Sequence, residues 1–188
     1  MLIFRSSKIL IYFHGNAEDL SGAASIMTKL SNSLKCHVIG LEYPGYGVWW
    51  LEKKSHTVII ERAKRLFEFL THDFGFKEKN IIVFGRSLGS GPATQVAAHY
   101  KPALLVLLSA YTSIKNVAKD IWWWAKCFIK ERFNSLSHIK NVDCPFLLVH
   151  GDRDDVIRSW HSQELYSEGM AHEKDWDWKI MAHMDHNR

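Results

Sequence analysis

The alternation of apolar and helical segments limits the fold of this chain more than any other feature. Short runs rich in Ile, Val, Leu and Phe alternate with longer segments in which apolar residues recur at helical spacing. This alternation predicts strand–helix units around a buried, mostly parallel sheet that helices cover on both faces, and so an α/β fold. We expect strands at Lys8 to Phe13, His37 to Glu42, Ile81 to Phe84, Leu104 to Ser109, Phe146 to His150 and Asp177 to Met181. We expect helices at Leu20 to Leu34, Thr57 to Phe74, Leu88 to Tyr100, Ile114 to Phe133 and Ser159 to Ala171.

Length and charge set the domain number and exclude one class of partner. A chain of 188 residues is long enough for one core and short for two, so residues 1–188 are expected to form a single domain. The formal net charge is +4, and the Lys and Arg residues are scattered rather than clustered, which argues against nucleic-acid binding.

The cysteines and the N-terminus indicate an intracellular protein. Cys36, Cys127 and Cys144 are far apart and have neither CxxC nor metal-ligand spacing, so a reducing, cytoplasmic compartment is expected. The apolar run near the N-terminus is too short to span a bilayer and is not followed by a signal-peptide cleavage site. We interpret it as the first strand.

The central chemical signal is the sequence Gly85-Arg86-Ser87-Leu88-Gly89, which lies between an expected strand and an expected helix. A nucleophilic serine on a sharp strand-to-helix turn needs small residues two positions before and after it. This turn also aims the backbone N–H of Leu88 at the position of a developing oxyanion. The bare GxSxG pattern is weak, and its strand–turn–helix setting is what predicts a nucleophile. A phosphate loop is disfavoured, because the sequence has no Gly-Lys-Ser/Thr ending.

A general base and an acid follow the serine in the order that such a site needs. The loop after the strand ending at His150 offers Asp152, Asp154 and Asp155, and the loop after the last strand offers His183 and His186. These side chains match no standard metal loop, so no metal is expected and the remaining charges are interpreted as solvated.

The loop after the first strand carries His14-Gly15-Asn16, where a second oxyanion donor is expected. Glycine would let the backbone turn so that the N–H of Asn16 faces the nucleophile. The alternative is an Asn-containing turn that caps the following helix. His14 and His150 are interpreted as structural residues, whereas Arg86 is equally suited to a substrate carboxylate or an acidic neighbour.

Six sequence blocks together resemble the ABHD-type α/β-hydrolases, especially the branch that contains protein depalmitoylases and esterases. The blocks are HGNAEDL, EYPGYG, FGRSLGSGPA, LSAYTS, HGDRDDVI and HMDHN. The resemblance implies that Ser87 is the nucleophile, Asp154 the acid and His186 the base, with the N–H groups of Asn16 and Leu88 as the oxyanion hole. It also implies an α/β-hydrolase fold with a short helical lid at about residues 110–140.

The chain departs from this family in two places. Val48-Trp49-Trp50 follows the GYG turn where relatives carry small residues, so the rim of the pocket is altered. Relatives also have extra strands before the first block and a helix after the catalytic histidine, and the chain is therefore expected to be a fragment or a trimmed member.

The lid segment supplies the expected substrate and membrane contacts. An apolar stripe at helical spacing packs on the body or roofs an acyl pocket, and Trp123 lies opposite it among lysines. That arrangement suits either a peripheral membrane contact or an exposed cation–π pair. The substrate and lid residues are expected to be Tyr111, Trp123 and Trp124.

These features predict a serine hydrolase that needs no cofactor and forms an acyl-enzyme on Ser87. The resemblance favours esters or thioesters, such as S-acylated proteins or lipid esters, and so depalmitoylation or lipid metabolism. A serine peptidase of the same fold and a non-catalytic ligand-binding scaffold are the alternatives.

Overall fold

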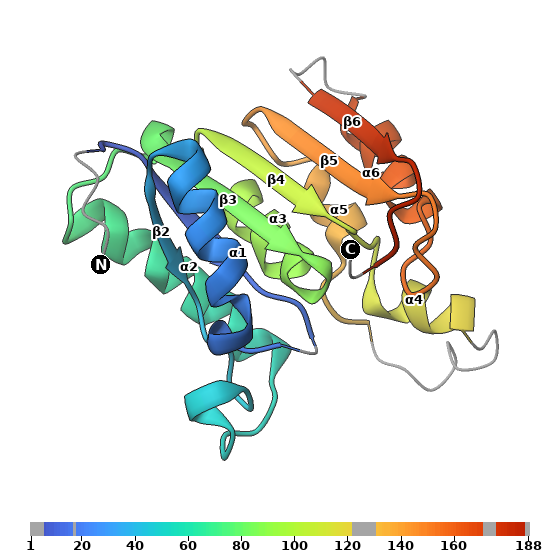
Figure 1. Ribbon diagram of the computed structural model, residues 1–188, viewed down its shortest axis with the longest axis horizontal. Helices are drawn as coiled ribbons and strands as arrows, with labels where there is room; N and C mark the ends of the chain where they lie inside the picture. The colour runs from blue at the N-terminus through green and yellow to red at the C-terminus, as the bar shows by residue number, and fades with distance from the viewer. Residues whose placement is uncertain (1–5, 17, 122–130, 171–175, 187–188) are drawn as a thin grey trace.

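The computed structural model describes residues 6–16, 18–121, 131–170 and 176–186. Within these ranges six strands form one sheet in the order β2-β1-β3-β4-β5-β6, and every neighbouring pair is parallel (Figure 1). The predicted α/β class with a parallel sheet is confirmed. The strands are β1 (Ile9–Phe13), β2 (His37–Gly40), β3 (Ile81–Arg86), β4 (Leu104–Leu108), β5 (Phe146–Gly151) and β6 (Trp176–Met181).

Helices lie on both faces of the sheet. In Figure 1, α1 crosses the near face, while α2, α3, α5 and α6 pack side by side behind the strands. The helices are α1 (Leu20–Leu34), α2 (His56–His72), α3 (Ser90–His99), α4 (Ile114–Ile121), α5 (Ser135–Ile139) and α6 (Trp160–Met170). Short 3-10 turns occur at Gly47–Trp49, Glu78–Asn80 and Ser87–Gly89.

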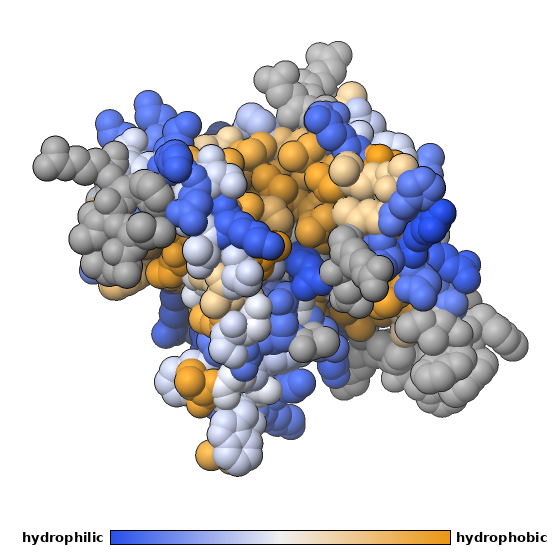
Figure 2. All heavy atoms as spheres, viewed as in Figure 1, coloured by the Kyte–Doolittle hydropathy of each residue, from blue (hydrophilic) through white to orange (hydrophobic). Residues whose placement is uncertain are grey.

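The strands are apolar at nearly every position because alternate residues enter two separate cores. In β1, Ile9, Ile11 and Phe13 pack toward the α2 and α3 side, whereas Leu10 and Tyr12 pack toward α1. This follows from the two-residue period of a strand that is covered on both sides. Beside α1 the near face is thinly covered, and Figure 2 shows an apolar area there over β3, β4 and β5.

The segment predicted as one helix from Ile114 to Phe133 is the main error in the predicted elements. α4 begins at Ile114 as expected, but residues 131–134 are not helical, and the unpredicted α5 follows them. Phe133 has a φ of 48°, a left-handed conformation that cannot continue a right-handed helix. Its ring is buried in the core, and this burial stabilises the break. Trp123 and Trp124, in the middle of the predicted lid, lie outside the described residues.

A buried polar cluster ties α4 to α6. His161 is fully buried, and its Nδ1 accepts a hydrogen bond from the backbone N–H of Thr112 (3.3 Å) and contacts Thr112 Oγ1 (2.8 Å). Because Nδ1 is an acceptor, the neutral ring carries its proton on Nε2, which lies 3.4 Å from Asp120 Oδ2. Trp160 stacks on the imidazole and donates to the same carboxylate at 2.8 Å. Burial of the ring lowers the pKa of His161 to about 4.

This cluster should make the fold acid-sensitive. The folded-state pKa of His161, about 4, lies below the ordinary value of 6.5, so the unfolded chain takes up the proton first as the pH falls. The contribution of neutral His161 to the free energy of unfolding is therefore complete above pH 6.5. About 3 kcal/mol of it is lost as the pH falls toward 4. In urea unfolding at several pH values, the free energy of unfolding should fall less steeply with falling pH in His161→Gln than in wild type. Equal slopes for the two proteins would contradict this account.

Candidate active site

Ser87 lies at a tight turn between β3 and α3, at the carboxyl edge of the sheet. Its φ is 50°, a strained value for a residue with a side chain, and the turn continues as a 3-10 turn into α3. The flanking glycines allow close backbone approach on both sides. A Cβ at Gly89 would lie 2.1 Å from the carbonyl oxygen of Phe13, and one at Gly85 would lie 2.7 Å from the Cβ of Ala93. The small residues around the serine are thus a packing requirement.

The structure brings Ser87, His186 and Asp154 into a continuous hydrogen-bonded chain. Ser87 Oγ lies 3.0 Å from His186 Nε2, and His186 Nδ1 lies 2.8 Å from Asp154 Oδ2 and 3.1 Å from Oδ1. A carboxylate can only accept, so Nδ1 carries the proton and Nε2 is free to accept from the serine hydroxyl. The three residues come from three loops that are far apart in the sequence and meet at one edge of the sheet.

Asp154 is the buried acid of its loop, whereas Asp152 and Asp155 are exposed. Its Oδ1 accepts from the backbone N–H groups of Val156 (3.1 Å) and Ile157 (2.8 Å). Burial alone raises the pKa of the Asp154 carboxyl, but hydrogen bonds from His150, His186 and the Ile157 N–H outweigh it and hold the pKa well below the usual range. Asp154 therefore stays ionised beside the imidazole.

Contacts between the loops that follow β5 and β6 fix the position of His186. Met184 O accepts from the N–H of Arg153 at 3.1 Å, and a Cβ at Gly151 would lie 2.0 Å from that same oxygen. His183, the other candidate base, occupies the turn itself with a φ of 62° and is exposed. The structure thus places His186, rather than His183, against the serine.

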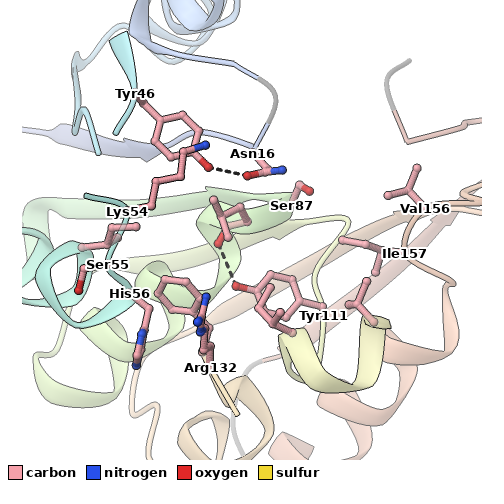
Figure 3. Close-up of a pocket in the computed structure, with 15 residues that line it drawn as sticks. Asn16, Tyr46, Lys54, Ser55, His56, Ser87, Tyr111, Arg132, Val156 and Ile157 are labelled. Atoms are coloured by element: carbon pink, nitrogen blue, oxygen red, sulfur yellow. Dashed lines mark hydrogen bonds between the residues drawn. The ribbon is translucent and has the colours of Figure 1, made fainter. Parts of the chain in front are cut away.

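The His14-Gly15-Asn16 loop faces the serine. A Cβ at Gly15 would lie 3.7 Å from the Cβ of Ser87, and the side chain of Asn16 accepts from the hydroxyl of Tyr46 (Figure 3). Asn16 does not cap α1, because Asp19 is the N-cap and accepts from the N–H of Gly22 at 2.9 Å. The capping alternative is therefore wrong, and the loop is free to present its backbone to the site.

Both strand-end histidines bind protein groups. His14 is fully buried, with Nδ1 2.8 Å from Gly15 O and Nε2 3.0 Å from Glu42 Oε1. His150 contacts Ile157 O and Ser162 Oγ through its two ring nitrogens. Within the described ranges, no cluster of three or more His, Cys, Asp or Glu side chains is arranged to hold a metal ion.

Arg86 connects the two sides of the site, a role that the sequence left open. Its Nη1 donates to Glu18 Oε1 at 2.8 Å, and its Nη2 donates to the carbonyl oxygen of His186 at 3.3 Å. Glu18 Oε1 also accepts from the N–H of Gly15 at 2.9 Å. One guanidinium thus braces both the Gly15 loop and the His186 loop. Glu18 was not predicted, although its place in the HGNAEDL block was an available signal.

A cavity of about 350 Å³ opens directly onto Ser87 (Figure 3). Tyr111, predicted to contact substrate, lies in its wall and donates to Leu88 O at 3.0 Å, and burial raises the pKa of its phenol well above the ordinary value. Lys54, His56 and Arg132 were not predicted, because no motif marks cavity-wall residues. The lining residues are Asn16, Tyr46, Lys54, Ser55, His56, Ile59, Ser87, Leu88, Tyr111, Ile114, Val117, Arg132, Phe133, Val156 and Ile157.

Sequence comparison places the chain among known proteins. No model of a known protein family matches it. A protein of Acanthamoeba polyphaga mimivirus named as an alpha/beta hydrolase is 30% identical over 162 residues, which are 85% of this chain and 60% of the relative. The Caenorhabditis elegans alpha/beta hydrolase domain-containing protein aho-3 is 33% identical over 157 residues, 84% of this chain and 46% of the relative.

Solved structures share the same architecture. A Pyrococcus furiosus esterase matches with a TM-score of 0.76 and 20% identity, covering 98% of this chain and 76% of the esterase. A Mycobacterium tuberculosis puromycin-hydrolyzing peptidase matches with a TM-score of 0.76 and 16% identity, covering 96% of this chain and 31% of the peptidase. The chain has the α/β-hydrolase fold, and its sequence is similar to proteins named as alpha/beta hydrolases.

The chain spans about half the length of the curated relatives it matches, from 46% to 60% of the relatives described above. Among its described helices, none is both long and apolar enough to cross a membrane. The predicted α/β-hydrolase fold and the resemblance to the ABHD-type proteins are confirmed.

The close approach at Gly89 gives a direct test of the turn. Gly89→Ala should lower the free energy of unfolding by roughly 1–3 kcal/mol, because the new Cβ meets the Phe13 backbone rather than a movable side chain. Gly22→Ala in α1 is the control and should raise it by up to about 1 kcal/mol, since the nearest atom there is at an ordinary 3.4 Å. Urea unfolding monitors both variants. An unchanged stability in Gly89→Ala would refute the packing argument.

Proposed function

We propose that this α/β hydrolase cleaves carboxylic esters or thioesters through an acyl-enzyme on Ser87. The observation that carries the proposal is the hydrogen-bonded chain from Ser87 Oγ through His186 to Asp154 at the mouth of the cavity. A serine in contact with a neutral imidazole that an ionised carboxylate orients is an activated nucleophile.

The chemistry needs two steps and no cofactor. Ser87 Oγ attacks the acyl carbonyl carbon while its proton passes to His186 Nε2, and the leaving alcohol or thiol then takes that proton. Water, deprotonated by the same imidazole, then attacks the acyl–serine ester; the bond to Ser87 Oγ breaks, the imidazole returns the proton to Oγ, and the carboxylic acid is released. In this proposal the backbone N–H groups of Asn16 and Leu88 bind the oxyanion.

The composition of the cavity wall favours an acyl chain. Its aliphatic and aromatic side chains come from α2, α4 and the segments around them. An apolar wall of this kind matches an acyl chain better than a polar or charged group. Within the proposed class, we infer that S-acyl proteins or lipid esters are the substrates, and hence that depalmitoylation or lipid metabolism is the physiological role.

A serine peptidase is the second candidate, favoured by the matched peptidase structure, because amide and ester hydrolysis share the same residues. Chromogenic acyl esters compared with aminoacyl anilides separate the two activities. A chain that folds but reacts with neither substrate would be a ligand-binding scaffold.

Covalent labelling tests the nucleophile directly. Wild type should be labelled by a fluorophosphonate probe and should hydrolyse medium-chain acyl esters, whereas Ser87→Ala should do neither. His186→Ala should lower the rate of ester hydrolysis by at least roughly 1,000-fold, while His183→Ala, its matched control, should retain most of the rate. Folded wild type that is not labelled, or equal losses in the two histidine variants, would refute the proposed mechanism.

The brace made by Arg86 gives a second test. We expect Arg86→Met to lower kcat roughly 10- to 100-fold, because both the Gly15 loop and the His186 loop lose a hydrogen-bond donor that holds them near Ser87. Arg65→Met, which removes an exposed pair with Glu61, is the control and should leave kcat unchanged. Steady-state kinetics with a soluble ester, alongside thermal melts, measure the effect. Equal kcat values in the two variants would show that Arg86 is not a positioning residue.

A further inference from the structure

The turn that follows β2 carries an exposed apolar tip, formed by Val48, Trp49, Trp50 and Leu51. The exposed fractions are 81%, 48%, 69% and 80% in that order. In Figure 1 this segment, drawn in cyan below β2 and α2, extends away from the body of the protein, and Figure 2 shows apolar atoms at its end. Four consecutive apolar side chains on a projecting turn have no role in the core.

The apolar tip is held in this shape by its own hydrogen bonds. Trp49 N donates to Tyr46 O at 2.8 Å, and Trp49 O accepts from the N–H groups of Gly45 (3.0 Å) and Glu52 (2.8 Å). Arg62 of α2 pairs with Glu52 at 2.8 Å and lies over the Trp49 ring at 5.6 Å. The exposure of the tip is therefore built into an ordered turn.

The charge beside the tip is positive. Lys53 and Lys54 follow it directly and are both exposed, and the Nζ of Lys54 lies 4.1 Å from the centre of the Tyr46 ring. Glu52, the nearest acidic side chain in sequence, is already paired with Arg62. Exposed tryptophan and aliphatic side chains flanked by lysine are the combination that binds an anionic membrane surface.

The same segment leads into the cavity. Tyr46 precedes the apolar tip and Lys54 and Ser55 follow it, and all three line the cavity that opens onto Ser87. A surface that bound the tip would therefore lie next to the entrance of the site. Because the tip is convex, it suits insertion between lipid headgroups better than the flat or concave contact of a protein partner.

We propose that the apolar tip inserts into an anionic lipid bilayer and places the cavity entrance at the headgroup level, where acyl chains can reach Ser87. This membrane contact is separate from the one predicted for the lid face. The nature of the delivered substrate rests on the proposed function, whereas the membrane contact does not.

The test measures vesicle binding in the Ser87→Ala background, so that hydrolysis plays no part. Co-sedimentation with vesicles of phosphatidylcholine and phosphatidylserine at low salt should show binding, with weaker binding to phosphatidylcholine alone. The triple variant Val48→Ser, Trp50→Ser, Leu51→Ser should reduce the partition coefficient at least about tenfold, since it removes the inserted apolar surface. Lys53→Gln should reduce it about fivefold on the anionic vesicles.

The matched control is the double variant Leu34→Ser, Phe74→Ser, which removes exposed apolar side chains near the ends of α1 and α2, at the other edge of the sheet. It should bind vesicles as the Ser87→Ala parent does. With Ser87 restored, the triple variant should hydrolyse a short soluble ester at the wild-type rate, because none of its three residues lines the cavity.

Three results would overturn the proposal. They are a lack of binding by the parent protein, equal binding by the triple variant and the control, and a loss of self-association in the triple variant with vesicle binding unchanged. The last result would make the tip an interface between copies of the chain. Failure of probe labelling at Ser87 would refute the proposed function without altering any of these measurements.

Discussion

The parallel direction of the six strands is the constraint on which the site depends. Every loop that follows a strand opens at the same edge of the sheet, so residues from four distant parts of the sequence meet there. Ser87 follows β3, Asp154 follows β5, His186 follows β6 and Asn16 follows β1. A single antiparallel strand among these four would have sent its loop to the opposite edge.

The sheet and much of this edge could be predicted from the sequence, because their causes are local. A strand buried on both faces has to be apolar at nearly every position, and a strained turn such as the one at Ser87 requires glycine at fixed offsets. The choice of His186 over His183, by contrast, depends on contacts between the loops after β5 and β6. The sequence pattern offered His183 and His186 as candidate bases, and the family resemblance was needed to choose between them.

Elements governed by distant contacts were predicted poorly. The apolar period from Ile114 to Phe133 predicts one continuous helix, because the period does not reveal that Phe133 has a left-handed conformation and buries its ring. The Arg86 brace is similar, since its partners Glu18 and His186 lie on opposite sides of Ser87 and no spacing rule joins them. Such features depend on how the loops meet in space.

Asp154 has two roles, one in orienting the base and one in shaping the cavity wall. The carboxylate that orients His186 also accepts the N–H groups of Val156 and Ile157, which form part of the cavity wall. One ionisation state thus governs both the readiness of the base and the shape of the acyl-binding wall. Since hydrogen bonds hold the pKa of that carboxyl well below its usual range, Asp154 is ionised at neutral pH, where reactivity and pocket shape are therefore coupled.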